Sequence, residues 1–158
     1  MAQSVDETIR GLRIIVSGLI AGLGFFTIVI AFGVGPLSRT PDPFLSRALP
    51  IGLGLFAVAA AAAYTVVRRK ILNDLRARAS AMRQVQDPSP LALDEYRRFV
   101  VAGGGLIEGP GFFAGIIYLL TGQPVALAAI GLAIALLATV HFPSAEKLRA
   151  FAEEAARD

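Results

Sequence analysis

Long apolar runs set the limits on how this chain can fold. They cover residues 14–34, 45–67, 99–120 and 125–140 and together contain a single acidic residue, Glu108. A helix needs roughly 20 apolar residues to cross the hydrocarbon core of a membrane. No run alternates with period two, which argues against barrel strands. The sequence therefore predicts an all-α polytopic membrane protein with four transmembrane helices in a single domain, residues 1–158.

Composition supports this class and excludes several functions. Hydrophobic residues make up 55% of the chain, above the level usual for a soluble domain. There is no cysteine and only one histidine, His141, so neither a thiolate metal site nor a catalytic nucleophile–base pair can be assembled. We expect no metal, no cofactor, no nucleic-acid partner and no enzymatic activity. Acidic residues at the N-terminus and the length of the first run argue against a cleaved signal peptide.

The basic residues predict an orientation. The chain has 15 Lys and Arg residues, most of them in the segment 68–98 and its flanks, and the turn at 121–124 has none. Basic residues concentrate on the cytoplasmic side of a membrane protein. We therefore expect both termini, the basic segment 68–98 and the tail 143–158 to be cytoplasmic.

The second apolar run continues into a basic stretch with a helical apolar stripe. This pattern is typical of a stop signal that only fixes orientation. The alternative is contact with anionic lipid headgroups, at about 1 kcal/mol per basic residue near the surface. The candidate headgroup residues are Arg68, Arg69, Lys70, Arg76 and Arg78.

Two segments of the chain nearly repeat one another. Residues 18–26 read GLIAGLGFF and residues 105–113 read GLIEGPGFF, so seven of nine positions agree at an offset of 87. A true duplication predicts two parallel helical hairpins related by an axis along the membrane normal; shared composition is the other explanation. Gly18 and Gly22 form a G-x-x-x-G, and small residues let membrane helices approach closely. The predicted packing glycines are Gly18, Gly22, Gly24, Gly105, Gly111 and Gly115.

Glu108 is the principal candidate site residue. It follows Arg98 by ten residues, which places it ~15 Å into the membrane. A bare carboxylate there is costly, so we expect it to be neutral or partnered. Pro110 and Gly109 predict a helix that is kinked or locally unwound beside it. Ser17, Thr27 and Tyr118 are possible hydrogen-bond partners.

Three interpretations of Glu108 are open. It can be a polar staple inside the bundle, a site for a proton, cation or ligand, or a contact with a partner membrane protein. His141 ends the fourth run and is interpreted as an interfacial residue rather than a switch.

Two resemblances follow from these motifs. Tyr96-Arg97-Arg98, GLIEGPGFFAGIIYLLTG and HFPSAEKL resemble a group of small uncharacterised bacterial four-span membrane proteins, which implies the bacterial inner membrane. The chain also resembles the duplicated proteolipid subunit of rotary ATPases, in its two hairpins, Gly-rich helices and single membrane carboxylate. It departs from that family because Glu108 lies on the first helix of its hairpin and a long basic segment joins the hairpins.

The function predicted from these features is a non-catalytic packing, assembly or accessory subunit. Its partners would be membrane lipids and either another membrane protein or further copies of the chain. The alternative is a proton- or ion-coupled membrane protein that uses Glu108.

Overall fold

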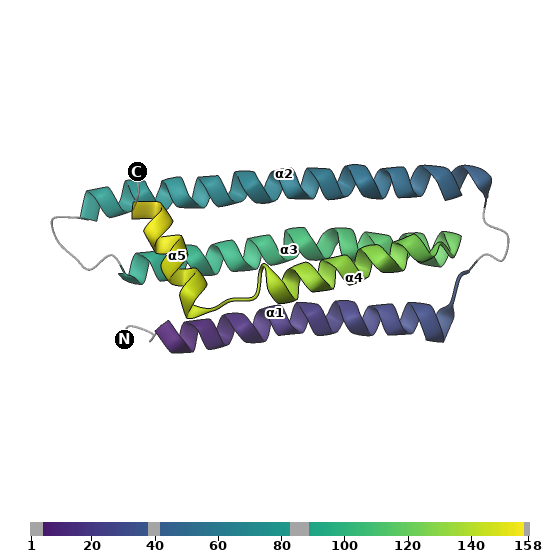
Figure 1. Ribbon diagram of the computed structural model, residues 1–158, viewed down its shortest axis with the longest axis horizontal. Helices are drawn as coiled ribbons and strands as arrows, with labels where there is room; N and C mark the ends of the chain where they lie inside the picture. Colours follow the sequence, from purple (N-terminus) through teal and green to yellow (C-terminus); the bar gives the residue numbers. More distant parts are fainter. Residues whose placement is uncertain (1–4, 38–41, 83–88, 157–158) are drawn as a thin grey trace.

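The computed structural model describes residues 5–37, 42–82 and 89–156, with the side chains of 79–90 set aside, and is all-α in these ranges (Figure 1). A π-helical segment follows the first helix. The elements are α1 (Val5–Ile28), η1 (Val29–Val34), α2 (Pro43–Met82), α3 (Ser89–Thr121), α4 (Pro124–Thr139) and α5 (Ala145–Ala156).

Three of these helices are long and apolar enough to cross a membrane. They are α1 together with η1, Pro43–Arg78 of α2, and Leu91–Thr121 of α3. The fourth predicted span corresponds to α4, which is apolar but has only 16 residues. Its length is about 24 Å, less than the roughly 30 Å of a hydrocarbon core. By length, therefore, only three of the four predicted spans qualify.

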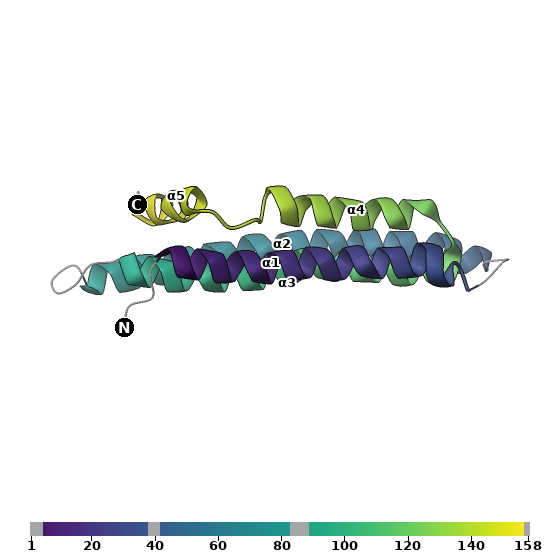
Figure 2. The same ribbon diagram turned by 90° about the horizontal axis from the view of Figure 1, so that it is seen from below.

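The helices form two layers. α1, α2 and α3 lie side by side with α3 in the middle, and α4 and α5 cover one face of this layer (Figure 2). α1 and α3 run in one direction, α2 and α4 in the other. The first residue of α1, the end of α2, the start of α3 and all of α5 therefore lie at the same end of the bundle. We call this end the charged end.

Local sequence signals fix where several helices begin. Asp42-Pro43 has the sequence pattern of an N-cap followed by proline at the first helical position, and in the structure Phe44 N–H donates to Asp42 Oδ1 (2.7 Å) at the start of α2. The backbone N–H of Lys147 donates to Ser144 Oγ (3.2 Å) and caps α5 in the same way. Gly122 turns the chain between α3 and α4 with φ +65°, a conformation that favours glycine. The sequence also predicts a helix start from the Ser4-x-x-Glu7 pattern and a helix end at Asp87-Pro88, but Ser4 and residues 87–88 lie outside the described residues.

The local unwinding predicted beside Glu108 does not occur, whereas a kink there stays a prediction. α3 is continuous from Ser89 to Thr121, with Pro110 inside it. Proline removes one backbone hydrogen bond, but α3 is the central helix and its neighbours α1, α2 and α4 hold it in place. The irregular turn occurs instead in η1, where the sequence gives no proline signal.

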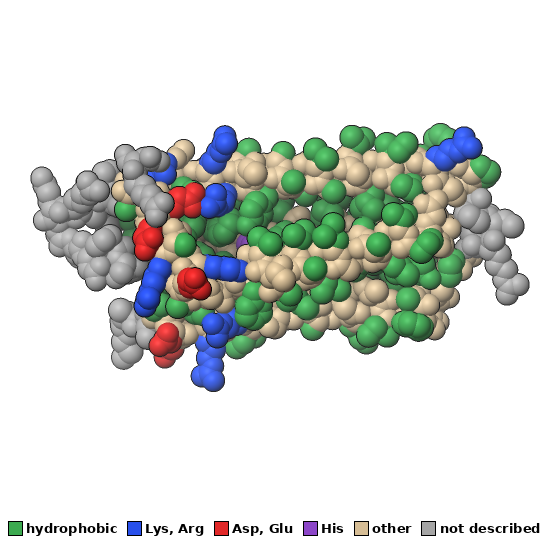
Figure 3. Space-filling view, in the orientation of Figure 1, with side chains coloured by type: hydrophobic (Ala, Val, Ile, Leu, Met, Phe, Trp, Pro, Cys, Tyr) green, Lys and Arg blue, Asp and Glu red, His purple; other side chains and the backbone are tan. Residues whose placement is uncertain are grey.

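Most charged side chains on the face shown gather at the charged end, and beyond them this face is an uncharged belt as far as one cationic side chain at the opposite end (Figure 3). Two buried clusters fill the interior. At the charged end Leu12, Val16, Leu72, Val100 and Phe151 belong to one cluster. At the opposite end Leu23, Ile30, Ile117, Ala126 and Ile130 belong to the other.

Candidate functional site

The contact between α1 and α3 is built from side chains on one helix and glycines on the other. A Cβ on Gly104 would lie 2.9 Å from Leu19 Cδ1, and a Cβ on Gly111 would lie 2.8 Å from Leu23 Cδ2. Gly115 receives the ring of Phe26 in the same manner. The absence of side chains on α3 thus lets α1 approach it closely.

The two near-repeats therefore lie side by side and run in parallel, but they play different parts. On α3, side chains of neighbouring helices occupy the space beside Gly111 and Gly115. On α1, by contrast, a Cβ added to Gly18, Gly22 or Gly24 would have no atom within 4 Å. Gly105 is equally open. Of the predicted packing glycines, only Gly111 and Gly115 pack within the chain; for the others the role stays a prediction.

Glu108 lies on the stripe of α3 that borders α1. Gly104, one turn before it, contacts Leu19, and Phe112, one turn after it, has its ring centroid 5.1 Å from that of Phe26. α4 covers the other side of this contact, where Ala133 approaches Gly111. Glu108 is partly exposed and Phe112 is 37% exposed, so this stripe lies on the uncovered face of the three-helix layer.

Within the two near-repeats, we group five residues that are exposed or partly exposed under the name open seam. It consists of Gly18 and Gly22 from α1 and Gly105, Glu108 and Phe112 from α3. A Cβ added to any of its glycines would meet no described residue within 4 Å. The open seam therefore combines uncovered glycines with one carboxyl group.

None of the predicted partners reaches Glu108. Ser17 is exposed on α1, and the Thr27 hydroxyl donates to the carbonyl oxygen of Leu23 at 2.7 Å. Tyr118 packs against the buried cluster that includes Leu23 and Ile30. Gly109 faces α2, where a Cβ would lie 3.6 Å from Phe56. Among the described residues, no hydrogen bond or ion pair joins Glu108 to another side chain. A staple inside the bundle thus has no partner in the described part of the chain.

A second polar group, missed by the sequence interpretation, lies near the charged end. His141 is only 3% exposed, and its Nε2 lies 2.6 Å from the carbonyl oxygen of Val100. That N–H donates to the carbonyl, which leaves Nδ1 as the acceptor for the Tyr64 hydroxyl at 3.5 Å. Burial lowers the pKa of His141, with Lys147 adding to the effect and the Val100 hydrogen bond opposing it. The imidazole is therefore held neutral.

The space for His141 comes from Gly103. A Cβ at that position would lie 2.5 Å from His141 Cε1 and 2.9 Å from Tyr64 Cε2. In the sequence, the Gly103-Gly104 pair indicates that another group can approach α3 closely at this point. Nothing in the sequence indicates which distant side chain occupies the space beside Gly103. His141 thus joins α2, α3 and the α4–α5 linker.

The five predicted headgroup residues divide into two sets. Arg68 Nη2 pairs with Glu154 Oε2 at 2.5 Å. The spacing in the sequence would also allow Arg78 to pair with Asp74, one helical turn before it, but Arg78 Nη1 pairs with Glu95 Oε1 at 2.9 Å. Arg76 donates to the backbone carbonyl of Glu154. These three hold α5 or the start of α3 to α2.

Arg69 and Lys70 are exposed and make no hydrogen bond or ion pair with a described residue. They are the members of the set best placed to meet lipid headgroups.

No group of three or more His, Asp or Glu side chains that could hold a metal ion exists among the described residues. No protein-family model, curated protein or solved structure matches the chain. The family resemblances drawn from the sequence therefore stay predictions. The structure supports a possible multi-span membrane protein with several long apolar helices.

Proposed function

We propose that this chain is a non-catalytic assembly or accessory subunit of the bacterial inner membrane, and that the open seam receives a transmembrane helix of a partner protein or a second copy. Four helices cross the membrane in this proposal, with both termini and the charged end in the cytoplasm. The observation that carries it is the partly exposed, unpartnered carboxyl of Glu108, flanked by glycines that meet nothing within the chain.

Physical cost supports this reading. An acidic side chain facing lipid near the bilayer midplane is expensive, whereas a neighbouring helix supplies a hydrogen-bond donor and excludes lipid from the carboxyl. Glycine also lowers the stability of a helix interior in water. Glycines that no other side chain covers are explained if the backbone of another helix packs closely on them. An added helix meets both needs at once.

The test is association in a mild detergent. Gly22→Leu and Gly105→Leu place a branched side chain on the open seam, while Gly131→Leu does so on an exposed, equally open position of α4. We expect light scattering to show a species heavier than the 16.6 kDa chain for the wild type and Gly131→Leu, and its loss for the two seam variants. A wild type that is strictly monomeric and co-purifies with no partner protein, or a Gly131→Leu variant that dissociates equally, contradicts the proposal.

The same carboxyl supports one alternative, coupling to a proton or cation. Glu108 would then carry the charge, as intramembrane acids do in pumps and transporters. Flux into liposomes that depends on Glu108, and that is lost in Glu108→Gln, favours this alternative. No flux in either protein, together with weakened association in Glu108→Gln, favours assembly.

A further inference from the structure

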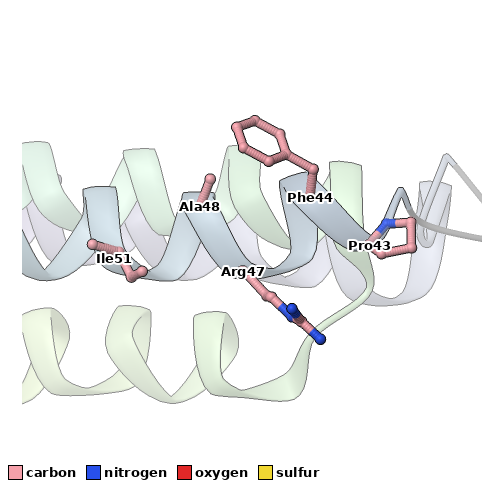
Figure 4. A pocket seen from close by; sticks show the side chains of 5 residues that line it. All are labelled: Pro43, Phe44, Arg47, Ala48 and Ile51. Atoms are coloured by element: carbon pink, nitrogen blue, oxygen red, sulfur yellow. The ribbon is translucent and has the colours of Figure 1, made fainter.

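The end of the bundle opposite the charged end carries a hollow on the first turns of α2. Its volume is about 510 Å³, and it is lined by Pro43, Phe44, Arg47, Ala48 and Ile51 (Figure 4). All the lining side chains except Arg47 are apolar. The hollow is therefore suited to a hydrocarbon chain that ends at one cationic group.

Arg47 is an isolated cation. It is exposed and makes no hydrogen bond or ion pair with a described residue, and it reaches from α2 toward the turn that joins α3 to α4 (Figure 4). Every other described Lys or Arg lies at the charged end, beyond the uncharged belt (Figure 3). A guanidinium group binds phosphate through two parallel N–H groups and is weakly hydrated, which favours this role at an apolar boundary.

The surrounding backbone adds to the attraction for an anion. Arg47 lies close to the N-terminus of α2, where the helix dipole is positive. The nearby carboxylate of Asp42 is engaged as the helix cap by the N–H of Phe44 at 2.7 Å. Ile51 lies one helical turn, about 6 Å, beyond Arg47 toward the uncharged belt.

We propose that this hollow binds an anionic phospholipid, with its phosphate at Arg47 and an acyl chain along Phe44, Ala48 and Ile51. The lipid would be held by a charge at the rim and by apolar contact below it. This site is independent of the open seam, because it lies on α2 and not on α1 or α3.

The chain has no tryptophan, so one introduced tryptophan reports on one place. Phe44→Trp puts the reporter in the hollow, and Phe32→Trp puts it on η1 at the same end but outside the residues that line the hollow, where Phe32 is 87% exposed. Each protein is reconstituted in bilayers of phosphatidylcholine and phosphatidylglycerol. Quenching is compared when the bromine label is on the acyl chains of one lipid or of the other.

At Phe44→Trp we expect brominated phosphatidylglycerol to bind about fivefold more strongly than brominated phosphatidylcholine, the ratio that about 1 kcal/mol per basic residue implies. Adding Arg47→Gln should remove the preference, Arg47→Lys should retain part of it, and Phe32→Trp should show none. Added inorganic phosphate should leave the preference unchanged, since the acyl chain contributes to binding.

Equal quenching by the two lipids at Phe44→Trp overturns the proposal, as does a preference that survives Arg47→Gln or that inorganic phosphate abolishes. An equal preference at Phe32→Trp also overturns it, because the effect would then belong to the whole surface.

Discussion

Two glycines on α3 that are two residues apart, Gly103 and Gly105, have opposite surroundings, which gives a sharp test of the packing. A Cβ at Gly103 would meet His141 and Tyr64, whereas a Cβ at Gly105 would meet nothing within 4 Å. We expect Gly103→Ala to destabilise the protein by about 1–3 kcal/mol, since the buried imidazole has little room to move. Gly105→Ala should be neutral or slightly stabilising, because alanine favours the helix.

Unfolding of the two variants by a denaturing detergent, followed by circular dichroism, measures the difference. Equal stability of Gly103→Ala and Gly105→Ala would show that His141 does not occupy the gap at Gly103.

His141 also predicts how stability depends on pH. It is the one histidine in the chain, and burial lowers its pKa below the usual 6.5. The unfolded chain then binds a proton at a pH where the folded chain does not. Stability should therefore be constant above about pH 7.5 and fall as the pH drops through 6.5, by at most about 1.4 kcal/mol per pH unit.

His141→Gln should be less stable at neutral pH but should lose most of this slope between pH 7.5 and 5.5. The measurement is the midpoint of detergent-induced unfolding across that range. A wild type whose stability rises on acidification in this window would contradict a neutral, buried imidazole.

At the scale of whole helices, the sequence predicted what depends on neighbouring residues. Asp42-Pro43 and Ser144 predicted helix starts that the structure confirms, because a cap is a contact over two or three residues. The sequence also predicted that α2 continues from the second span into its basic extension, because the apolar stripe of that extension is a local helical pattern.

The features that depended on distant partners were missed. Pro110 predicted a kink or local unwinding, yet α3 is not unwound, because neighbouring helices pack around it and no local pattern reports on that packing. The same limit applies to the candidate site. Sequence singled out Glu108 as an unusual residue, but only the fold shows that Ser17 and Tyr118 do not reach it and that His141 fills the gap at Gly103.

For the whole molecule, the short α4 is the element on which the topology depends. It is about 24 Å long, so it spans a bilayer only where the membrane thins slightly or the flanking residues complete the crossing. In the structure α4 brings the chain back from the turn at Gly122 to the charged end, where Lys147 Nζ donates to the carbonyls of Thr139 and Val140 at 2.8 Å each. Lys147, in the first turn of α5, thus supplies hydrogen bonds to backbone carbonyls at the C-terminal end of α4.

A chain without cysteine allows this topology to be tested one site at a time with a membrane-impermeant maleimide. Single cysteines at Leu37 and Val125, both exposed at the end opposite the charged end, should be labelled in intact cells. Cysteines at the exposed positions Asp74 and Arg149 should be labelled only after permeabilisation, because the positive-inside rule places the charged end in the cytoplasm. If Val125 and Arg149 are labelled from the same side, α4 does not cross the membrane. If the pattern is exchanged between the two pairs, the four crossings stand but the orientation is reversed, and Arg47 then faces the cytoplasmic leaflet.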